Sequence, residues 1–462
     1  MAHERVDSAA MLRMLPSVER LLQHAALAPF PRALAVRCAR EVVDDLRQKA
    51  RTGDVDANAF LALAAESAAA AAAAERARSS QRMRHRRVVN ATGIVLHTGL
   101  GRAPLAEQAT RAIVDAAGYA IVEVDPRTGI RDQRELAVSS LLAQTTGAEA
   151  GLVVNNNAAA TTLALGALCY GLEVVVSRGE LVEIGGGFRV PDVMKRAGCL
   201  MVEVGATNKT HLRDFEEAVT ERTRAFLKVH PSNFRIEGFA GVPPLADLCK
   251  LAHERGLWVL DDLGSGLMVN DSIPGLDGEP RVRESLAAGA DVVCFSGDKL
   301  LGGPQCGVLI GSKKHIAAMR AHPLYRALRC DKLTLAALEA TLLVYRDGQP
   351  MEEIPALRML SARAEELKER SDALCKLLPP GASHVVASES FAGSGANPAK
   401  PLPSFAVAIA GGDALADRLR AAMPIPVFAR VHDGHVLFDA RSLLFEDLSA
   451  LAATIRGALS SS

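Results

Sequence analysis

One lysine of this chain lies in the stretch Ser296-Gly297-Asp298-Lys299-Leu300-Leu301-Gly302-Gly303-Pro304-Gln305. The stretch follows the apolar run Asp291–Phe295, which is typical of a buried strand, so Lys299 stands where that strand ends and a glycine-rich turn begins. Burial lowers the pKa of a lysine, and a neutral amine can form a Schiff base with an aldehyde. The stretch therefore predicts a pyridoxal 5'-phosphate site with Lys299 as its lysine. The alternative is a solvated lysine in an ordinary strand-to-loop turn.

A pyridoxal-phosphate site also needs a carboxylate that keeps the ring nitrogen protonated. Two acids, Asp261 and Asp262, follow the apolar run Leu257–Leu260. Because successive side chains of a strand point to opposite faces, the two acids cannot easily face the same ligand. We choose Asp262 as the predicted partner of the ring nitrogen, and the choice between the two stays open. Without Lys299, the pair would be interpreted as a solvated strand end.

Backbone N–H groups at the start of a helix bind phosphate well. The stretch Asn155–Thr162 has this character, because it follows the strand candidate Gly151–Val154 and begins an alanine-rich helix. Simple capping of that helix by asparagine is the alternative. The predicted ligands of the cofactor phosphate are Asn156, Asn157, Ala158 and Ser296.

From about residue 90, β-rich apolar runs alternate with helical stretches, which predicts an α/β fold with a mostly parallel sheet and helices on both faces. Ligands of such sheets gather at the carboxyl ends of the strands, where Lys299, Asp262 and His230–Asn233 fall. The predicted strands are Gly151–Val154, Glu173–Ser177, Leu200–Val204, Ala225–His230, Leu257–Asp261, Asp291–Ser296 and Gly307–Ile310. The predicted helices between them are Ala158–Tyr170, Pro191–Gly198, Leu212–Thr220, Pro244–Arg255 and Val282–Gly289.

The two ends of the chain differ from this central part. Residues 10–50 have apolar side chains at helical spacing, interrupted at Pro31, and residues 57–80 are so rich in alanine that we expect one long linker helix there. The last hundred residues mix helical patterns, one of them over Pro355–Leu378, with three strand candidates. Those strands are Ser404–Ala410, Val427–Val431 and His435–Asp439. We predict three domains: a helical domain over residues 1–87, a large cofactor-binding α/β domain over 88–345 and a small α+β domain over 346–462.

Charge is unevenly distributed, although the formal net charge is zero. Residues 1–87 carry fifteen Lys and Arg against ten Asp and Glu, whereas the other residues carry 38 against 43. The excess ends in the basic run Gln81–Arg87. A positive domain on a slightly negative body indicates a polyanionic partner such as a nucleic acid. The alternative is a solvated linker with a charge run.

The eight cysteines are scattered, form no C-x-x-C pair and mostly lie in apolar surroundings. This usage is typical of a reduced cytoplasm and argues against a disulfide framework or a zinc site. No apolar run is long enough to cross a bilayer, and no secretory signal is apparent. We therefore expect a cytoplasmic protein with neither a membrane nor a metal as its partner.

The motifs together resemble those of the bacterial selenocysteine synthases, the L-seryl-tRNA(Sec) selenium transferases. The match begins at Arg87–Arg102 and continues in order to Ser296–Gln305. The motifs between are Asn155–Ala159, Ser177–Glu180, Ile184–Gly186, Gly205–Thr210, Ser232–Phe234 and Asp262–Gly266. So many ordered matches exclude chance, and Leu15–Val18 with the leucines that follow is similar to the family's N-terminal domain.

The resemblance implies a pyridoxal-phosphate enzyme of fold type I, like the aminotransferases, with Lys299 as the cofactor lysine and Asn233 as a further cofactor ligand. It implies that selenophosphate is bound by Arg102, Arg326 and Arg329. It also implies that the N-terminal domain grips the tRNA and that the protein assembles as a homodecamer, a pentamer of dimers. The segment Asp125–Asp132 departs from the family, with Thr128 where an arginine is expected, which leaves Arg131 to serve in that loop.

The activity implied by the resemblance is the conversion of L-seryl-tRNA(Sec) to L-selenocysteinyl-tRNA(Sec) with selenophosphate, through an aminoacrylyl intermediate on the cofactor. Lys299, displaced by the seryl amine, would take the Cα proton while Asp262 keeps the ring nitrogen protonated. The seryl carboxylate is esterified to tRNA and needs no arginine, so arginines remain available for phosphate.

Two alternatives stay open. The first is a pyridoxal-phosphate-dependent β-eliminating lyase or sulfur transferase that acts on a free amino acid, whose carboxylate would need an arginine such as Arg430. The second is a non-catalytic tRNA-binding protein with the same fold, against which the intact stretch Ser296–Gln305 argues. Three further questions are left open by the sequence: selenium or sulfur as the element transferred, the acid that protonates the leaving hydroxyl, and how tRNA(Sec) is distinguished from tRNA(Ser).

Overall fold

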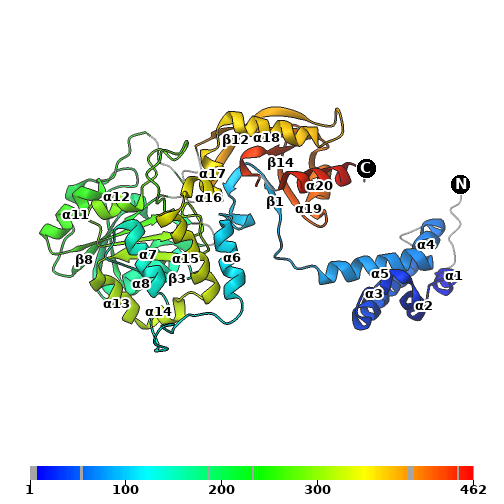
Figure 1. The fold of residues 1–462 in the computed structure, drawn as a ribbon, viewed down its shortest axis with the longest axis horizontal. Helices are drawn as coiled ribbons and strands as arrows, with labels where there is room; N and C mark the ends of the chain where they lie inside the picture. Colours follow the sequence, from blue (N-terminus) through cyan, green and yellow to red (C-terminus); the bar gives the residue numbers. More distant parts are fainter. Residues whose placement is uncertain are drawn as a thin grey trace. The chain divides into compact units, whose positions relative to one another are not determined.

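The structure is a computed structural model that describes residues 8–52, 56–184, 187–231, 234, 236, 238–393, 400–444 and 447–460. Its contacts divide the chain into two compact units, Met1–Arg87 and Val88–Ser462, and each has its own hydrophobic core (Figure 1). Among the described residues, no helix combines the length and the apolar character that crossing a membrane requires.

The N-terminal unit is helical, as predicted, and its core lies where helix α3 (Arg32–Thr52) packs against α5 (Glu66–Gln81). The expected linker helix over residues 57–80 is wrong. The chain turns at Ala65, between α4 (Ala57–Ala64) and α5, and one face of α5 is fully buried. Alanine carries only a methyl group, so the alanine run lets two helices approach closely and forms core instead of a spacer. The fully buried alanines of α5 are Ala69, Ala70, Ala73, Ala74 and Ala77.

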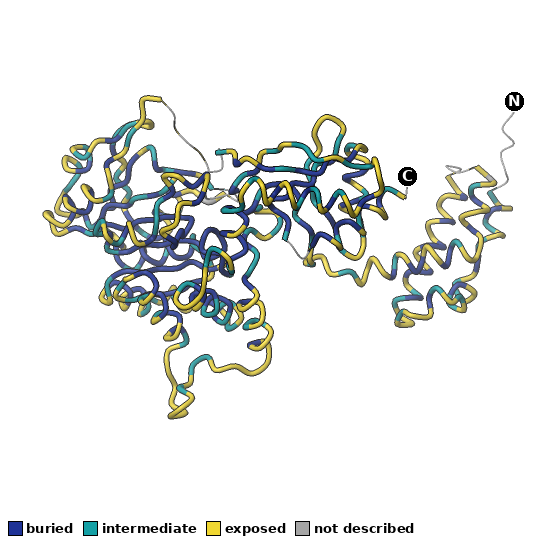
Figure 2. The backbone as a smooth tube through the Cα atoms, turned by 45° about the horizontal axis from the view of Figure 1, so that its top comes forward, coloured by how far each residue is buried: buried dark blue, intermediate teal, exposed yellow. Residues whose placement is uncertain are grey.

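The second unit contains a seven-stranded sheet in the order β3-β11-β10-β9-β8-β4-β7. All seven predicted strands are present, and only the pairs β10–β11 and β11–β3 are antiparallel, so the predicted mostly parallel sheet is confirmed. Burial of β3, β4 and β10 explains why these strands are almost entirely apolar (Figure 2). The strands are β3 (Ala150–Val154), β4 (Glu173–Ser177), β7 (Leu200–Val204), β8 (Thr223–Val229), β9 (Trp258–Gly264), β10 (Val292–Ser296) and β11 (Gly307–Gly311).

Helices cover both faces of this sheet, as the α/β pattern predicts. One face packs against α8 (Asn157–Leu168), α9 (Val190–Arg196) and α13 (Lys313–Ala321). The other face packs against two groups of helices, one beside β4, β8 and β9 and one beside β3, β10 and β11. The helices of this face are α10 (Leu212–Glu217), α11 (Leu245–Glu254), α12 (Val282–Ala287), α7 (Leu136–Thr146) and α15 (Lys332–Asp347). Side chains of one strand therefore meet different environments at odd and even positions.

A six-stranded sheet lies beyond, in the order β1-β14-β15-β13-β12-β2. The three predicted C-terminal strands are present, as β13 (Leu402–Ala410), β14 (Val427–His432) and β15 (His435–Asp439). Helices α18 (Ala364–Lys376), α19 (Gly412–Ala421) and α20 (Leu448–Ser460) pack on it, and the predicted helix over 355–378 is divided into α17 (Pro355–Ser361) and α18. Its outermost strands β1 (Val89–Ala91) and β2 (Ile94–Leu96) come from the start of the unit and pair in parallel with β14 and with β12 (His384–Gly393). The domain limit at 345/346 stays a prediction.

The carboxylate of Asp439 connects five segments of this small sheet. Asp439 is fully buried, and both of its oxygens accept several hydrogen bonds. The turn between β1 and β2 packs against it so closely that a Cβ on Gly93, whose φ is +78°, would lie 2.8 Å from Asp439 Oδ2. The donors to Asp439 are Ser388 Oγ (2.8 Å), Ser390 Oγ (2.8 Å), Ser404 Oγ (2.8 Å), Arg430 Nη2 (3.1 Å) and Arg441 N (3.0 Å).

We expect Asp439→Ala to lower the free energy of unfolding by about 3 kcal/mol or more, because it leaves buried hydroxyls and a partly buried guanidinium without their acceptor. The exposed Asp417, which forms a surface ion pair with Arg420, provides the control, and Asp417→Ala should change stability by less than about 0.5 kcal/mol. Denaturant unfolding of the two variants measures the difference. Equal stabilities would contradict the role given to Asp439.

Candidate active site

Lys299 lies at the carboxyl edge of the large sheet, in the tight connection between β10 and β11. The Gly297 N–H donates to the Cys306 carbonyl at 2.8 Å, and a Cβ on Gly297 would lie 2.6 Å from the Pro304 carbonyl oxygen, so only glycine fits there. The lysine is 5% exposed. Burial, together with the nearby Arg102 guanidinium, lowers the pKa of Lys299, which favours the neutral amine that the sequence predicts.

Asp262 lies inside β9 and faces α8. Its Oδ1 accepts a hydrogen bond from Asn157 Nδ2 at 2.7 Å and its Oδ2 accepts one from Thr161 Oγ1 at 2.9 Å. Burial raises the pKa of Asp262, while these two donors and the Lys299 ammonium act in the opposite direction. Asp261 points to the other face of the sheet, and burial raises its pKa to about 6. The sequence predicted that this strand ends at Asp261, but it continues through both acids to Gly264.

The first turn of α8 lies beside Asp262. Asn156 caps the helix, with its side-chain oxygen accepting from the Ala159 N–H at 2.8 Å, so the predicted capping is present. Asn157 and Ala158 form the first helical residues, and Asn157 Oδ1 is buried without a hydrogen-bond partner among the described residues. Ser296, at the end of β10, is buried. A helix start, a carboxylate and a buried amine therefore meet at one edge of the sheet, and this group of side chains fits a flat ligand with a phosphate.

Arg102 approaches Lys299 from the segment after β2. Its Nη1 lies 2.5 Å from Asp298 Oδ2, and its backbone has φ +61°, a conformation that is rare outside glycine. Arg102 Nε is buried and has no hydrogen-bond partner in the described part of the chain. A cavity of about 490 Å³ opens at this point. It is lined by Thr98, Gly101, Arg102, Ala103, Leu105, Asp298, Gly303, Pro304 and Gln305.

The two other predicted arginines lie in α14 (Pro323–Leu328) or just after it. Arg326 is exposed on α14, and Arg329 directly follows it. Arg329 forms an isolated β-bridge with Val154, the last residue of β3, and the Asn155 N–H donates to the Leu328 carbonyl at 2.9 Å. The structure therefore places Arg329 next to the start of α8.

The carboxylate of Glu123 lies close to three arginines, and nothing in the sequence indicates that these residues are neighbours. Its carboxylate accepts from Arg134 at 2.8 Å and from Arg131 at 2.7 Å, which lower its pKa, and Arg329 Nη1 lies 3.7 Å away. Arg131, one of the two arginines of the divergent loop, is thus paired with an acid of its own segment. Asn233, predicted as a cofactor ligand, lies outside the described residues.

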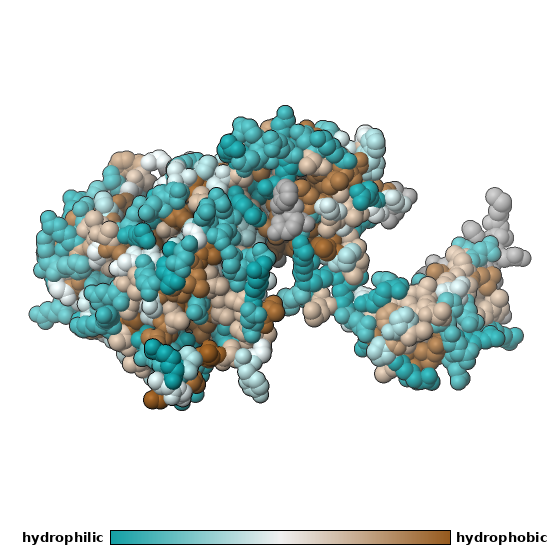
Figure 3. All heavy atoms as spheres, viewed as in Figure 1, coloured by the Kyte–Doolittle hydropathy of each residue, from teal (hydrophilic) through white to brown (hydrophobic). Residues whose placement is uncertain are grey.

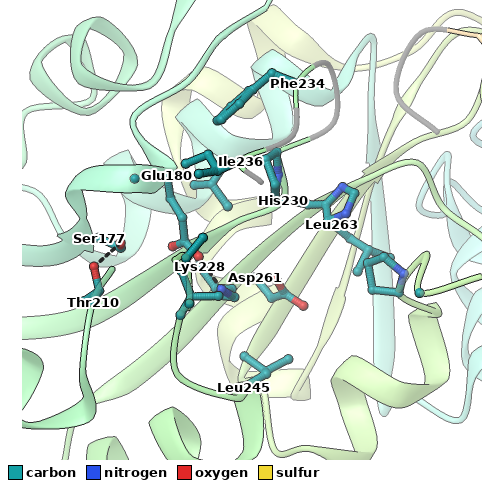
Figure 4. Close-up of a pocket in the computed structure, with 18 of the residues that line it drawn as sticks. Ser177, Glu180, Thr210, Lys228, His230, Phe234, Ile236, Leu245, Asp261 and Leu263 are labelled. Carbon is teal, nitrogen blue, oxygen red and sulfur yellow. Dashed lines mark hydrogen bonds and ion pairs between the residues drawn. The ribbon is translucent and has the colours of Figure 1, made fainter. Parts of the chain in front are cut away.

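A second cavity opens on the other face of β8 and β9. Asp261 was considered only as a partner of the ring nitrogen, and Glu180, Lys228 and Glu279 were not predicted as site residues. Lys228 forms a buried ion pair with Glu180, and Asp261 lies beside them (Figure 4). Glu279 is buried too, and burial raises its pKa to about 7. His230 lines the same cavity, and burial lowers its pKa to about 4. The available signal was a lysine inside the apolar end of strand β8, Ala225–Val229. Glu279 follows a glycine-rich loop and has no local signature.

Arg430, considered as a ligand for the carboxylate of a free amino acid, is already engaged. Its Nη2 donates to Ser388 Oγ at 2.6 Å and to the buried Asp439 at 3.1 Å. These contacts place Arg430 in the polar cluster around Asp439.

Comparison with known proteins gives a consistent result over nearly the whole chain. The family model described as L-seryl-tRNA selenium transferase matches residues 88–444, and that described as selenocysteine synthase N terminal matches residues 12–47. A relative from Geobacter sulfurreducens, named L-seryl-tRNA(Sec) selenium transferase, is 45% identical over 457 residues, covering 96% of this chain and 98% of its own. A relative of the same name from Moorella thermoacetica is 45% identical over 468 residues and covers 98% of each chain.

Among solved structures, a D-glucosaminate-6-phosphate ammonia-lyase matches with a TM-score of 0.59 and 23% identity, covering 81% of this chain and 96% of its own. At that identity the match concerns the fold alone. Together with the sheet order, it confirms the predicted α/β fold of the aminotransferase-like type.

The pKa of Glu279 predicts how stability changes with pH. Because the folded state raises this pKa from 4.5 to about 7, the cost of burying the glutamate is absent below pH 4.5 and grows as the pH rises to 7 and above. We expect Glu279→Gln, which keeps the shape but cannot ionise, to melt at a higher temperature than the wild type at pH 8, by a free-energy difference of up to about 3 kcal/mol.

The difference should shrink towards pH 5, and thermal unfolding at several pH values measures it. Glu217→Gln, at an exposed glutamate of α10, is the matched control. A melting-temperature difference that is independent of pH would contradict the assignment of a buried, ionisable Glu279.

Proposed function

The chain belongs to the L-seryl-tRNA selenium transferase family, and we propose from this premise that it converts L-seryl-tRNA(Sec) to L-selenocysteinyl-tRNA(Sec). The family predicted from the sequence motifs is thereby confirmed, and so is the prediction that the chain is a transferase. One observation carries the proposal: a buried Lys299, next to Asp262 and the start of α8, in a chain that matches these transferases along almost its full length.

We propose pyridoxal 5'-phosphate as the cofactor, held by residues that fit it chemically. Lys299 offers an amine with lowered pKa, Asp262 a carboxylate, and the first turn of α8 backbone N–H groups for phosphate. Asn157 Oδ1, buried without a partner among the described residues, is an acceptor that a ligand can satisfy. When bound, the cofactor would draw electrons away from the seryl Cα.

The side chains have separate tasks in this proposal. Asp262, oriented by Asn157 and Thr161, would hold a proton on the ring nitrogen. Lys299 would take the proton from the seryl Cα, for which its amine must be neutral, and burial provides that condition. The closed turn around Gly297 keeps the amine away from water and fixes its position.

We propose that selenophosphate is the donor and that Arg102, Arg326 and Arg329 bind its phosphate. Arg102 is the best supported of the three, because its strained backbone, its buried Nε and its cavity all lie beside Lys299. Arg329 lies at the start of α8, where the cofactor phosphate is proposed, so it can serve either anion. The proposed role of Arg326 is supported by the family resemblance alone.

The N-terminal unit is proposed as the part that grips the tRNA. The basic side chains of its helix α3 are exposed to solvent and can contact the phosphates of a nucleic acid directly. These are Arg32, Arg37, Arg40, Arg47, Lys49 and Arg51. Hydrophilic residues cover much of the visible face of the chain (Figure 3).

We also propose the homodecamer, a pentamer of dimers, that the resemblance implies, and a cytoplasmic location. The segment after α6 (Glu107–Ala116) supports an assembly, because its apolar side chains are exposed in a projecting loop (Figure 2). These side chains are Tyr119, Ile121, Val124 and Ile130. The eight cysteines, all free thiols, support a reducing compartment.

The activity is tested by mixing the purified protein with seryl-tRNA(Sec) and selenophosphate and analysing the aminoacyl group, with free serine and free cysteine as alternative substrates. Lys299→Ala should abolish both the visible absorbance of the holoprotein and the formation of selenocysteine, because it removes the buried amine that is proposed to form the Schiff base. The control is Lys313→Ala, at an exposed lysine of α13, which should retain both. An active and coloured Lys299→Ala protein would remove this residue from the reaction.

Deletion of residues 1–85 should spare cofactor absorbance but weaken tRNA binding, since the second unit has its own core. Binding by the full chain should fall steeply with salt, because each lysine or arginine that contacts a phosphate releases counterions. Titration of tRNA at two or more salt concentrations measures both effects. If the truncated protein bound tRNA as tightly as the full chain, the N-terminal unit would not be the tRNA-binding part.

A further inference from the structure

The second cavity, on the face of the large sheet opposite α8, has a volume of about 590 Å³. Lys228 and Asp261 project into it from β8 and β9, whereas their neighbours Leu227 and Asp262 face α8 (Figure 4). The volume lies in the range of sites for small ligands. The mechanism outlined for Lys299 and Asp262 uses none of its charged residues.

The cavity adjoins the proposed reaction site. Leu263, which lines the cavity, directly follows Asp262, and the Leu300 N–H donates to the Ser265 carbonyl at 2.9 Å. The segments that carry Asp262 and Lys299 are thus joined at the wall of the cavity. A group bound in it can therefore project a short substituent around the end of β9 towards Lys299.

The inner end of the cavity offers hydrogen-bond acceptors that lack donors. Glu180 Oε2 and Glu279 Oε1 are buried, and neither has a hydrogen-bond partner among the described residues. Both residues are 3% exposed, so water reaches them poorly. The carboxylates of Glu180 and Asp261 lie beside the ammonium group of Lys228, and Glu279 adds a third carboxylate to the cavity, near Lys299. Such an end repels phosphate and is suited to an uncharged group that donates hydrogen bonds.

The outer end is different, because it is apolar and partly exposed. Phe234 is 39% exposed and lies with Ile236 at the other side of the cavity from Asp261, and Val242 is half exposed (Figure 4). An aromatic ring at such a place can stack on a nucleobase. Lys209, which also lines the cavity, holds its ammonium 3.9 Å above the ring of the exposed Phe239, and it offers a cation for a phosphate outside.

We propose that this cavity binds the terminal adenosine of the aminoacylated tRNA. The inference rests on the proposed function, which brings a seryl group attached to that adenosine next to Lys299. The base stacks on Phe234, the one sugar hydroxyl that the seryl ester leaves free or the exocyclic amine donates to Glu180 and Glu279, and the preceding phosphate lies near Lys209. A nucleoside is uncharged, carries several donors and has a flat base, so it matches both ends of the cavity.

Cross-linking tests this placement directly. Seryl-tRNA(Sec) ending in 8-azidoadenosine is irradiated with the holoenzyme, and the modified peptides are mapped. We expect adducts in residues 207–210, 228–245 or 277–285. Adducts elsewhere, with an enzyme that converts the same seryl-tRNA(Sec) to the selenocysteinyl form, would overturn the adenosine site and leave the proposed function intact. Absence of conversion with ordinary seryl-tRNA(Sec) would overturn the proposed function first.

Two variants give an independent kinetic test. Phe234→Ala removes the stacking ring and should lower kcat/KM for seryl-tRNA(Sec) about tenfold or more, while overall tRNA affinity and cofactor absorbance stay near the wild type. Val242→Trp, which fills the outer end, should have the same effect without removing any polar group. Tyr170→Ala is the control, since Tyr170 is an exposed aromatic residue that does not line this cavity. Unchanged kcat/KM in both variants would show that the adenosine does not enter here.

Discussion

The desolvation of one amine, that of Lys299, is the constraint on which the rest of the site depends. A buried lysine is tolerated only where its neighbours are fixed, because its pKa balances burial and Arg102 against the carboxylates of Asp262, Asp298 and Glu279. Asp262 is fixed by two donors from α8, and Asp298 is paired with Arg102. A shift of any of these groups would change the charge of the amine, so the surrounding helices and turns act as its support.

Because side chains alternate along β9, the two faces of the large sheet can bind different ligands. Asp262 faces α8 and the proposed cofactor, whereas Asp261 faces the cavity proposed for the end of the tRNA. Two adjacent acids can thereby serve two ligands without competing, since the strand itself separates them. From the sequence, only one of Asp261 and Asp262 could be assigned to the ring nitrogen, so the choice between them was ambiguous. In the structure both side chains are buried, on opposite faces of the sheet.

The sequence predicted the large sheet well, because strands buried on both faces are continuous apolar runs that need no distant information. It also placed Lys299, Asp262 and Asn156 at one edge through the rule for carboxyl ends of parallel strands. It missed β1 and β2, which are three residues long and pair with strands more than 290 residues away, and it missed β12. Glu279 could not be predicted because its burial depends on tertiary packing, and the alanine run of α5 was misjudged because it has no apolar period.

The pairing of β1 and β2 with the C-terminal strands also determines the order in which the chain can fold during synthesis. In the large sheet, β4, β7, β8, β9 and β10 pair with strands that are close in sequence, whereas β3 must wait for β11. The small sheet must wait until β14 and β15 have been translated, while residues 89–91 stay without their partner strand. A ribosome that stalls before residue 427 would therefore release a chain with exposed strand edges, a substrate for chaperones or proteases.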